Sequence, residues 1–478
     1  MAQSKVKLFI ENFLVYGVGG VISKIIPLVM VPIVTRLMPD TSYYGISDLS
    51  STVVSFGSAL AVMGMYDAMY RMFFEKDDER YKKDICSTAL FFTAGTSAAV
   101  FLVMILLKDV IARFVFGSQE YGFLIYITAM ATLVGATNSI VSAPTRMQNK
   151  RKIFLLMNML GPMLSYSVSI PLILSGRYLV ALPLASLITG TSSELIFWAL
   201  NHDWFSLRRF RKEHLKPLLA IAVPLLPNFL IYWVFNSCDK LMIANILDTS
   251  ATGIYSVGSK LGHASQLIYT AFAGGWQFYA FSTMKEKDQV KSNSLIFEYL
   301  GIISFVCTMF VFSLSKPIYE LLFTGSYVSG FIVAPYLFLA PLLQMLFQVA
   351  CNQFLVVKRT WPNMFILSTG AAANIVLNLW LIPRLGIEGA AIATLVGYAV
   401  SDIIGVIVLI KLKLMTIESR FLIAVCVMTT FIIIWRLTFV EHVSLALFLA
   451  AVCSGMMVLL YLRDVKQLLK NLRRGKQK

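Results

Sequence analysis

The chain has 478 residues, of which 58% are hydrophobic and only 14% are charged, and its formal net charge is +16. Soluble proteins usually carry about 25% charged residues, so the composition excludes a soluble globular domain and indicates a membrane protein. The basic residues fall in alternate loops and not on one module, which argues against a partner that is nucleic acid.

Apolar runs recur from the start of the chain to its end, each about 20 residues long and therefore long enough to cross roughly 30 Å of hydrocarbon. We predict an all-α polytopic membrane protein with about fourteen transmembrane helices, because an isolated span must satisfy its backbone hydrogen bonds internally. The first run is too long for a signal peptide and is assigned as a span. The predicted spans are residues 12–37, 44–70, 85–107, 121–143, 153–174, 178–200, 217–247, 250–282, 294–314, 331–357, 363–383, 388–410, 420–438 and 443–462.

The loops between these spans differ in charge. Every second loop is rich in Lys and Arg, as at residues 80–83 and 208–216, whereas the intervening loops carry at most two such residues. By the positive-inside rule this alternation places both termini in the cytoplasm.

An internal duplication relates the two halves of the chain. The string at residues 40–46 (DTSYYGI) recurs at residues 248–254 (DTSATGI), and the same offset relates Lys150 to Lys358. Six spans in each half imply parallel repeats about a pseudo-two-fold axis along the membrane normal. The predicted parts are an N-terminal six-helix lobe (1–208), a C-terminal six-helix lobe (209–416), two additional spans (417–462) and a basic cytoplasmic tail (463–478).

Three lysines lie deep within predicted spans. An ionisable side chain at membrane depth is expensive and is therefore a candidate for function. A cavity with ammonium groups and hydrogen-bond donors suits a polyanion such as pyrophosphate, and the alternative is that each lysine is paired structurally or reaches the interface. The predicted substrate-binding residues are these lysines and their neighbours on the same helix faces: Lys24, Lys240, Lys260, Asn236, His263 and Trp233.

Four further charged residues are candidates for gating or coupling. Asp67 and Arg71 are four positions apart and are expected to pair, either as a gate or as a structural ion pair. Asp48 lies near the predicted outer surface, so the alternative to a role in gating or coupling is that its carboxylate is simply solvated. Asp239 directly precedes Lys240. A proton could be carried by Asp48, Asp239 or His263; sodium coupling and the absence of coupling remain open.

Several segments resemble the Wzx-type polysaccharide flippases of the multidrug/oligosaccharidyl-lipid/polysaccharide exporter superfamily. They are residues 23–37 (SKIIPLVMVPIVTRL) with 44–46 (YGI), 64–71 (GMYDAMYR), 275–278 (GWQF) and 390–394 (AAIAT). The resemblance implies a V-shaped pair of lobes with alternating access in a bacterial cytoplasmic (inner) membrane. It also implies that the substrate moved to the outer leaflet is an undecaprenyl-pyrophosphate-linked oligosaccharide. Whether a glycan polymerase is a partner is left open.

Two other functions remain as alternatives. A multidrug or organic-cation antiporter of the same superfamily would need carboxylates deep in the cavity, whereas the deep positions here are lysines. A membrane-embedded glycan polymerase or ligase usually needs a sizeable outer loop with catalytic side chains, and the predicted outer loops are short. The sequence contains no catalytic signature or metal-ligand spacing, so we expect no catalytic residue, metal or cofactor.

Overall fold

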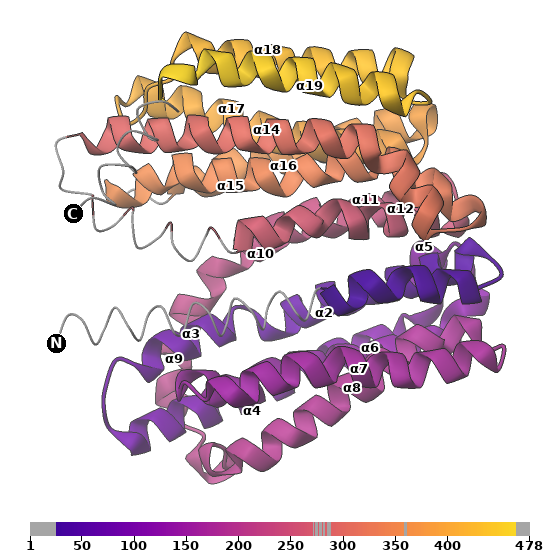
Figure 1. The fold of residues 1–478 in the computed structure, drawn as a ribbon. Helices are drawn as coiled ribbons and strands as arrows, with labels where there is room; N and C mark the ends of the chain where they lie inside the picture. Colours follow the sequence, from indigo (N-terminus) through magenta and orange to yellow (C-terminus); the bar gives the residue numbers. More distant parts are fainter. Residues whose placement is uncertain are drawn as a thin grey trace. The chain divides into compact units, whose positions relative to one another are not determined.

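The computed structural model describes residues 25–270, 272, 276, 280, 283, 288–357 and 361–464. This part of the chain is built from helices and contains no strand, which confirms the all-α prediction (Figure 1). Lys24 lies outside the described residues.

Twelve helical segments in the described part of the chain are long and apolar enough to span a membrane, and each overlaps one of the predicted spans. Eleven are α2 (Thr41–Val62), α4 (Glu79–Leu106), α6 (Gly122–Met147), α7 (Arg151–Leu174), α8 (Tyr178–Asn201), α14 (Gln289–Leu322), α15 (Ala334–Val356), α16 (Trp361–Leu385), α17 (Ile387–Lys411), α18 (Ser419–Ile434) and α19 (Val443–Leu460). The twelfth is the composite segment Lys212–Ile246. Helices Ile25–Leu37 and α12 (Thr249–Gly262) occupy the two remaining predicted spans, so the architecture agrees with about fourteen spans.

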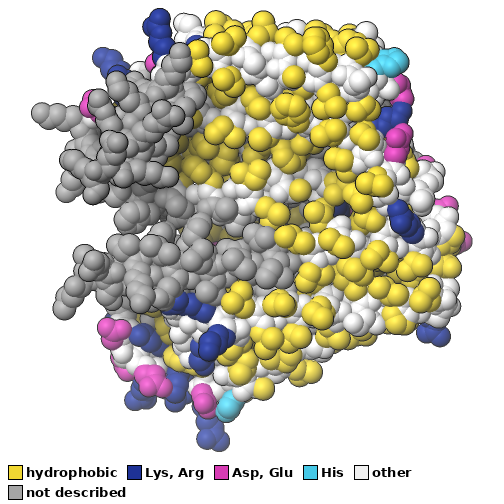
Figure 2. All heavy atoms as spheres, viewed as in Figure 1, with side chains coloured by type: hydrophobic (Ala, Val, Ile, Leu, Met, Phe, Trp, Pro, Cys, Tyr) yellow, Lys and Arg dark blue, Asp and Glu magenta, His cyan; other side chains and the backbone are white. Residues whose placement is uncertain are grey.

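The surface has the distribution of side chains that a bilayer requires. On the face shown in Figure 2, hydrophobic side chains cover the middle of the helices, and Lys, Arg, Asp and Glu gather near the helix ends. Large apolar side chains such as Leu106, Leu321 and Phe448 are exposed, which is favourable only where they meet lipid.

The composite segment is broken into three helices: α9 (Lys212–Ala222), α10 (Leu226–Trp233) and α11 (Asp239–Ile246). The first break, a 3₁₀ turn, coincides with Pro224, and Pro227 follows within α10. Proline lacks the N–H that a helix interior needs, so it favours an interruption at this position. The second break is a π-helix, Val234–Cys238, a local widening often found at functional sites.

Two aspartates at equivalent places in the duplicated strings begin α2 and α12. Asp40 caps α2 by accepting a hydrogen bond from the Ser42 N–H at 2.7 Å, and Asp248 accepts one from the Ala251 N–H at 2.6 Å. Such caps satisfy N–H groups that have no partner within the helix. The hydrogen bonds from Ser42 also lower the pKa of the Asp40 carboxyl.

The chain forms two compact units. The first comprises Met1–Val257 and Ile375–Ala390, and the second comprises Gly258–Asn374 and Ala391–Lys478. The division into lobes at residue 208 stays a prediction.

The first unit is organised around α6, which packs against α2, α4 and α8, while α7 packs mainly on α8 (Figure 1). Two short helices, α3 (Met65–Phe73) and α5 (Lys108–Phe116), complete its opposite ends. Gly64 connects α2 to α3 with a φ of +76°, and a Cβ there would lie 2.6 Å from the Ala222 carbonyl oxygen. Only glycine fits both conditions, so α9 packs closely at this corner.

In the second unit, α14 packs against α15, α18 and α19. Its buried Glu298 accepts hydrogen bonds from the Tyr461 hydroxyl at 2.9 Å and from the Glu418 N–H at 2.8 Å. Arg420 lies 3.6 Å from Glu298 and 2.5 Å from Asp464. This cluster ties the two C-terminal spans to α14.

Candidate functional site

A buried ion pair joins two of the predicted site residues. The Lys240 Nζ of α11 lies 2.6 Å from the Asp48 Oδ2 of α2. The Ser256 hydroxyl of α12 donates a second hydrogen bond, of 2.8 Å, to the same oxygen. The side chains of Asp48 and Lys240 are 8% and 13% exposed, so both charges are largely removed from solvent. We call these three residues the Asp48 cluster.

The duplicated strings meet beside the Asp48 cluster. A Cβ on Gly45 would lie 2.0 Å from the Thr249 carbonyl oxygen, and a Cβ on Gly253 would lie 2.0 Å from the Thr41 carbonyl oxygen. The hydroxyls of Thr41 and Ser250 are also hydrogen-bonded to each other. The two glycines therefore allow the backbones of α2 and α12 to touch, in a reciprocal contact between positions 208 apart.

Two other predicted residues of the composite segment lie close to this cluster in sequence. The Trp233 indole N–H donates to the Ser55 hydroxyl at 3.2 Å, and its ring centre lies 4.7 Å from that of Phe56, both on α2. Asn236 is in the π-helix, where its amide donates to the Tyr232 carbonyl oxygen at 2.7 Å.

Asp239 is buried and accepts a hydrogen bond from the Tyr255 hydroxyl. Tyr255 and Ser256 are adjacent on α12, so this helix supplies a partner to each of the two aspartates. The hydrogen bond between Tyr255 and Asp239 therefore joins α12 to α11.

Lys260 and His263 belong to the second unit. Lys260 is an exposed residue near the end of α12, and His263 begins the 3₁₀ turn that follows. With Lys24 outside the described residues, the structure leaves the joint cavity of three lysines untested.

The structure excludes the alternative given for Asp48 and does not show the pair expected of Asp67 and Arg71. Asp48 is not a solvated carboxylate, because its side chain is only 8% exposed and Lys240 and Ser256 bind it. Asp67 and Arg71 are both exposed on α3, and among the ion pairs of the described residues none joins them. An exposed pair at this spacing gains only about 0.3–0.5 kcal/mol, which is too little to hold the long Arg71 side chain in one geometry.

The Asp48 cluster holds two opposite charges that are largely shielded from solvent. Two buried charges at 2.6 Å compensate each other, and removing one partner from such a pair typically costs about 3–5 kcal/mol because the other stays buried and uncompensated. A ligand that offers Lys240 another anion would replace that compensation.

Sequence reasoning missed Ser256, Tyr255 and Ser55 as partners. The duplication did contain a signal for Ser256, because it is the repeat equivalent of Asp48, 208 positions later. A pseudo-two-fold relation between the repeats, as predicted from the sequence, would bring equivalent residues near the axis together, and the sequence could have been searched for such pairs.

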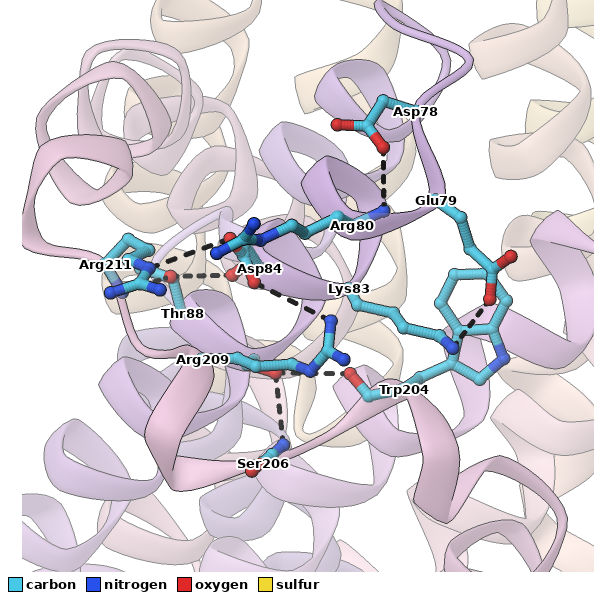
Figure 3. A network of polar contacts seen from close by, with 11 residues as sticks. Asp78, Glu79, Arg80, Lys83, Asp84, Thr88, Trp204, Ser206, Arg209 and Arg211 are labelled. Carbon is cyan, nitrogen blue, oxygen red and sulfur yellow. Dashed lines mark hydrogen bonds and ion pairs between the residues drawn. The ribbon is translucent and has the colours of Figure 1, made fainter.

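A second polar network fixes the segment between α8 and α9 to the start of α4 (Figure 3). Asp84, whose side chain is 10% exposed, lies 3.9 Å from the Arg209 Nη1 and 3.7 Å from the Arg211 Nε. The Arg211 N–H donates to the Thr88 hydroxyl at 3.1 Å, and the Ser206 N–H donates to the Ser87 hydroxyl at 3.1 Å. The segment is thus bound through its backbone as well as its charges.

Comparisons with solved structures show the fold. "Lipid II flippase MurJ, inward closed conformation" matches with a TM-score of 0.71 and 14% identity, over 95% of this chain and 99% of that one. An inward-facing multidrug resistance MATE family transporter of the MOP superfamily matches with a TM-score of 0.64 and 13% identity, over 82% and 98%. An outward-facing structure of the same kind matches with a TM-score of 0.58 and 15% identity, over 85% and 95%.

The chain therefore has the fold of the MOP superfamily of membrane transporters. No curated protein matches the sequence. A family model described as "Polysaccharide biosynthesis protein" matches residues 33–331, which is more than half of the chain. The match agrees with the resemblance to polysaccharide flippases seen in the sequence, and the chain belongs to this family of polysaccharide biosynthesis proteins.

Proposed function

We propose that the protein is a flippase that moves an undecaprenyl-pyrophosphate-linked oligosaccharide from the inner to the outer leaflet of a bacterial cytoplasmic membrane by alternating access. The observation that carries the proposal is the match to a family of polysaccharide biosynthesis proteins, and the fold shared with a lipid II flippase supports it. The buried Lys240 supplies the matching chemistry, since an ammonium group at membrane depth suits an anionic lipid headgroup.

In this proposal the pyrophosphate competes with Asp48 for Lys240. While the site is empty, Asp48 compensates the ammonium group at 2.6 Å. A pyrophosphate carries several oxygens and can bind the lysine and nearby hydrogen-bond donors together. Lys24, Lys260, Asn236, His263 and Trp233 are proposed as the other groups that contact the substrate.

Release of Lys240 links binding to movement. Once the pyrophosphate takes the lysine, Asp48 keeps only Ser256 among the partners of the cluster, and the link between α2 and α11 weakens. We propose that the orientation predicted from the loops holds, with cytoplasmic termini and with α2 and α12 beginning at the outer side. The glycine contact would then close the outer end and separate in the outward-open state.

The two six-helix repeats at 1–208 and 209–416 belong to the same proposal. Its support is the reciprocal contact of Gly45 and Gly253 and the hydrogen bond between Asp48 and Ser256, each of which joins equivalent positions. A two-fold relation between parallel repeats produces this kind of pairing.

Coupling is proposed to act through the aspartates of the same region. Protonation of Asp48, or of Asp239 beside Tyr255, would remove a charge that holds α11 in place. Asp67 and Arg71 are proposed as exposed contributors to a gate at the other end of α2 and α3. The proposal also includes a proton or a sodium ion as the coupling ion and a glycan polymerase as a partner. No feature of the described residues bears on the choice of ion or on the polymerase.

The test is binding of a purified lipid-pyrophosphate oligosaccharide to the full-length protein, measured by native mass spectrometry. We expect Lys240→Ala to reduce binding about tenfold or more and a Lys24→Ala, Lys240→Ala, Lys260→Ala variant to reduce it further. Lys316→Ala, which removes a surface lysine paired with Glu441, is the matched control and should bind as the parent does. Equal binding by all variants, or binding of organic cations in place of the lipid, would refute the proposal.

A further inference from the structure

An acidic side chain near the middle of a membrane-spanning helix takes no part in the clusters described above. Asp402 is on α17, about 23 Å along the helix from Ile387 and about 14 Å from Lys411 at a rise of 1.5 Å per residue. It lies in the second unit and is 8% exposed. Ionisable groups at this depth are rare because they are costly, so each is a candidate for function.

Neither carboxyl oxygen of Asp402 has a hydrogen-bond partner. Both oxygens are buried, and no ion pair between the described residues includes this side chain. Most buried polar atoms in native structures are bonded, so two unbonded oxygens on one side chain need an explanation. An ionised carboxylate here would be far more costly than the neutral acid, because nothing compensates its charge.

The helices beside this part of α17 offer no counter-charge. A Cβ on Gly405 would lie 3.3 Å from the Cys351 Sγ and 3.7 Å from Phe347, both on α15, and 3.9 Å from Ile366 on α16. Residues 361–374 of α16 include no titratable side chain. From α15, the Cys351 thiol is close enough to interact with the Asp402 charge. A thiol is neutral or negative, so it cannot stabilise a carboxylate.

Asp402 also borders an apolar cavity of about 850 Å³ between α14, α15, α17 and α18. Tyr336 and Arg436 are the other titratable groups on its described lining, and neither forms an ion pair with Asp402. The charged groups Glu298 of α14 and Arg420 of α18 lie 3.6 Å from each other. The rest of the lining is mostly aliphatic and aromatic, so the cavity cannot solvate an ionised Asp402.

The acid at the equivalent position of the first half has a different environment. Glu194 of α8, 208 positions before Asp402, is partly exposed and lies beside the Thr137 hydroxyl of α6. At the same offset, the position of Thr137 is occupied by Met345 of α15. The second half therefore contains the acid but has an apolar side chain at the position of the hydroxyl.

A proton fits this position better than a metal ion does. Hard metal cations need several oxygen ligands, whereas the side chains that face this part of α17 from α15 and α16 present sulfur and carbon. Among the described residues, no group of three or more His, Cys, Asp or Glu side chains could hold a metal. A proton needs only the carboxyl oxygen itself.

We propose that Asp402 is a proton-binding site and that the proton stays bound while α17 is packed on α15. Opening of this packing admits water, the proton passes from the carboxyl oxygen to a water molecule, and the remaining carboxylate is solvated. Proton binding and helix packing therefore favour each other. The use of the site rests on the proposed function: in a flippase that alternates between two states, it makes a proton the coupling ion.

Difference infrared spectroscopy on the full-length protein in phospholipid vesicles tests the protonation directly, because the carbonyl stretch of a carboxylic acid is separate from the bands of a carboxylate. At neutral pH, the spectrum of the parent minus that of Asp402→Asn should contain one acid band. Asp203→Asn is the matched control, since Asp203 is exposed in the turn after α8, and its difference spectrum should contain no acid band. Carboxylate bands in place of the acid band for Asp402→Asn would overturn the proposal.

Hydrogen exchange tests the link between protonation and packing. If opening requires the loss of one proton, the protection factors of α17 amides in the parent should fall by up to about tenfold per pH unit as the pH rises. Asp402→Asn has the shape of the neutral acid and no charge at any pH, so its protection factors should stay level. Asp203→Asn should follow the parent. An equal fall in the parent and Asp402→Asn, or no fall in either, would overturn the proposal.

Neither experiment needs a substrate, so each separates this inference from the proposed function. If the parent binds the lipid-linked oligosaccharide in native mass spectrometry but shows no acid band from Asp402, the proton site fails and the flippase proposal stands. If the acid band is present and the lipid does not bind, the flippase proposal fails and the proton site stands. If both are found, a pH gradient should drive lipid movement in proteoliposomes of the parent and not of Asp402→Asn, and equal movement in the two would overturn the coupling.

Discussion

Replacing Gly45 by alanine is expected to separate α2 from α12. The added Cβ would lie 2.0 Å from the Thr249 carbonyl oxygen, whereas a close C···O contact is about 3.3 Å. The atoms that collide belong to backbone, so a side-chain rotation cannot relieve the clash. The two helices must move apart by roughly 1.3 Å to accept the methyl group.

The movement also weakens the Asp48 cluster. If α11 moves with α12, the distance between Lys240 and Asp48 grows from 2.6 Å to about 3.9 Å, beyond a hydrogen bond. With an effective dielectric constant of about 20, the Coulomb energy of the pair falls by about 2 kcal/mol. That is a shift of about 30-fold in the equilibrium between closed and separated helices.

Disulfide cross-linking measures this equilibrium. Thr41 and Ser250 are in hydrogen-bond contact, so Thr41→Cys with Ser250→Cys should cross-link readily in a background without the six native cysteines. Gly45→Ala should lower the yield strongly. Gly95→Ala is the matched control, because a Cβ at Gly95 would have no atom within 4 Å. Equal yields in the two variants would refute the reasoning.

Three further substitutions test the polar clusters. Asp48→Asn should lower the free energy of unfolding by about 3–5 kcal/mol, because Lys240 stays buried without its counter-charge. Adding Lys240→Met should restore most of this loss. Equal melting temperatures of the single and double variants would contradict this expectation. Asp84→Asn should increase trypsin cleavage at Arg209 several-fold by freeing the segment before α9, and unchanged cleavage would show that the backbone hydrogen bonds alone hold it. Glu298→Gln should speed hydrogen exchange in α18 and α19, since bonds to a charged acceptor contribute about 1.5–3 kcal/mol; unaltered exchange would mean that apolar packing fixes these helices.

The spans were predictable because apolar length and the alternation of basic loops are properties of the sequence itself. The twelve spanning segments overlap predicted spans for this reason. The short helix α5, at residues 108–116, was missed, because nine residues with Lys108 and Arg113 cannot span a bilayer and resemble a loop. The interruption at Val234–Cys238 was also missed, since no proline or glycine marks it.

Candidate residues could be named from the sequence, but their pairings could not. Lys240, Asp48 and Asp239 were identified because charges are costly in a span. Which acid meets which lysine depends on how α11 and α12 pack against α2, and this is a tertiary property. Asp67 and Arg71 show the reverse error: local spacing favoured a pair that their exposure makes too weak to persist.

The attachment of the segment before α9 bears on how the protein is synthesised. Residues 204–211 provide Asp84 with both arginines and occupy the hydroxyls of Ser87 and Thr88. A nascent chain that has inserted only its first six spans therefore lacks the segment that covers Asp84 and supplies its counter-charges. The N-terminal half completes its folding only after the ribosome has added the linker, so a polypeptide truncated before residue 204 should assemble poorly in the membrane.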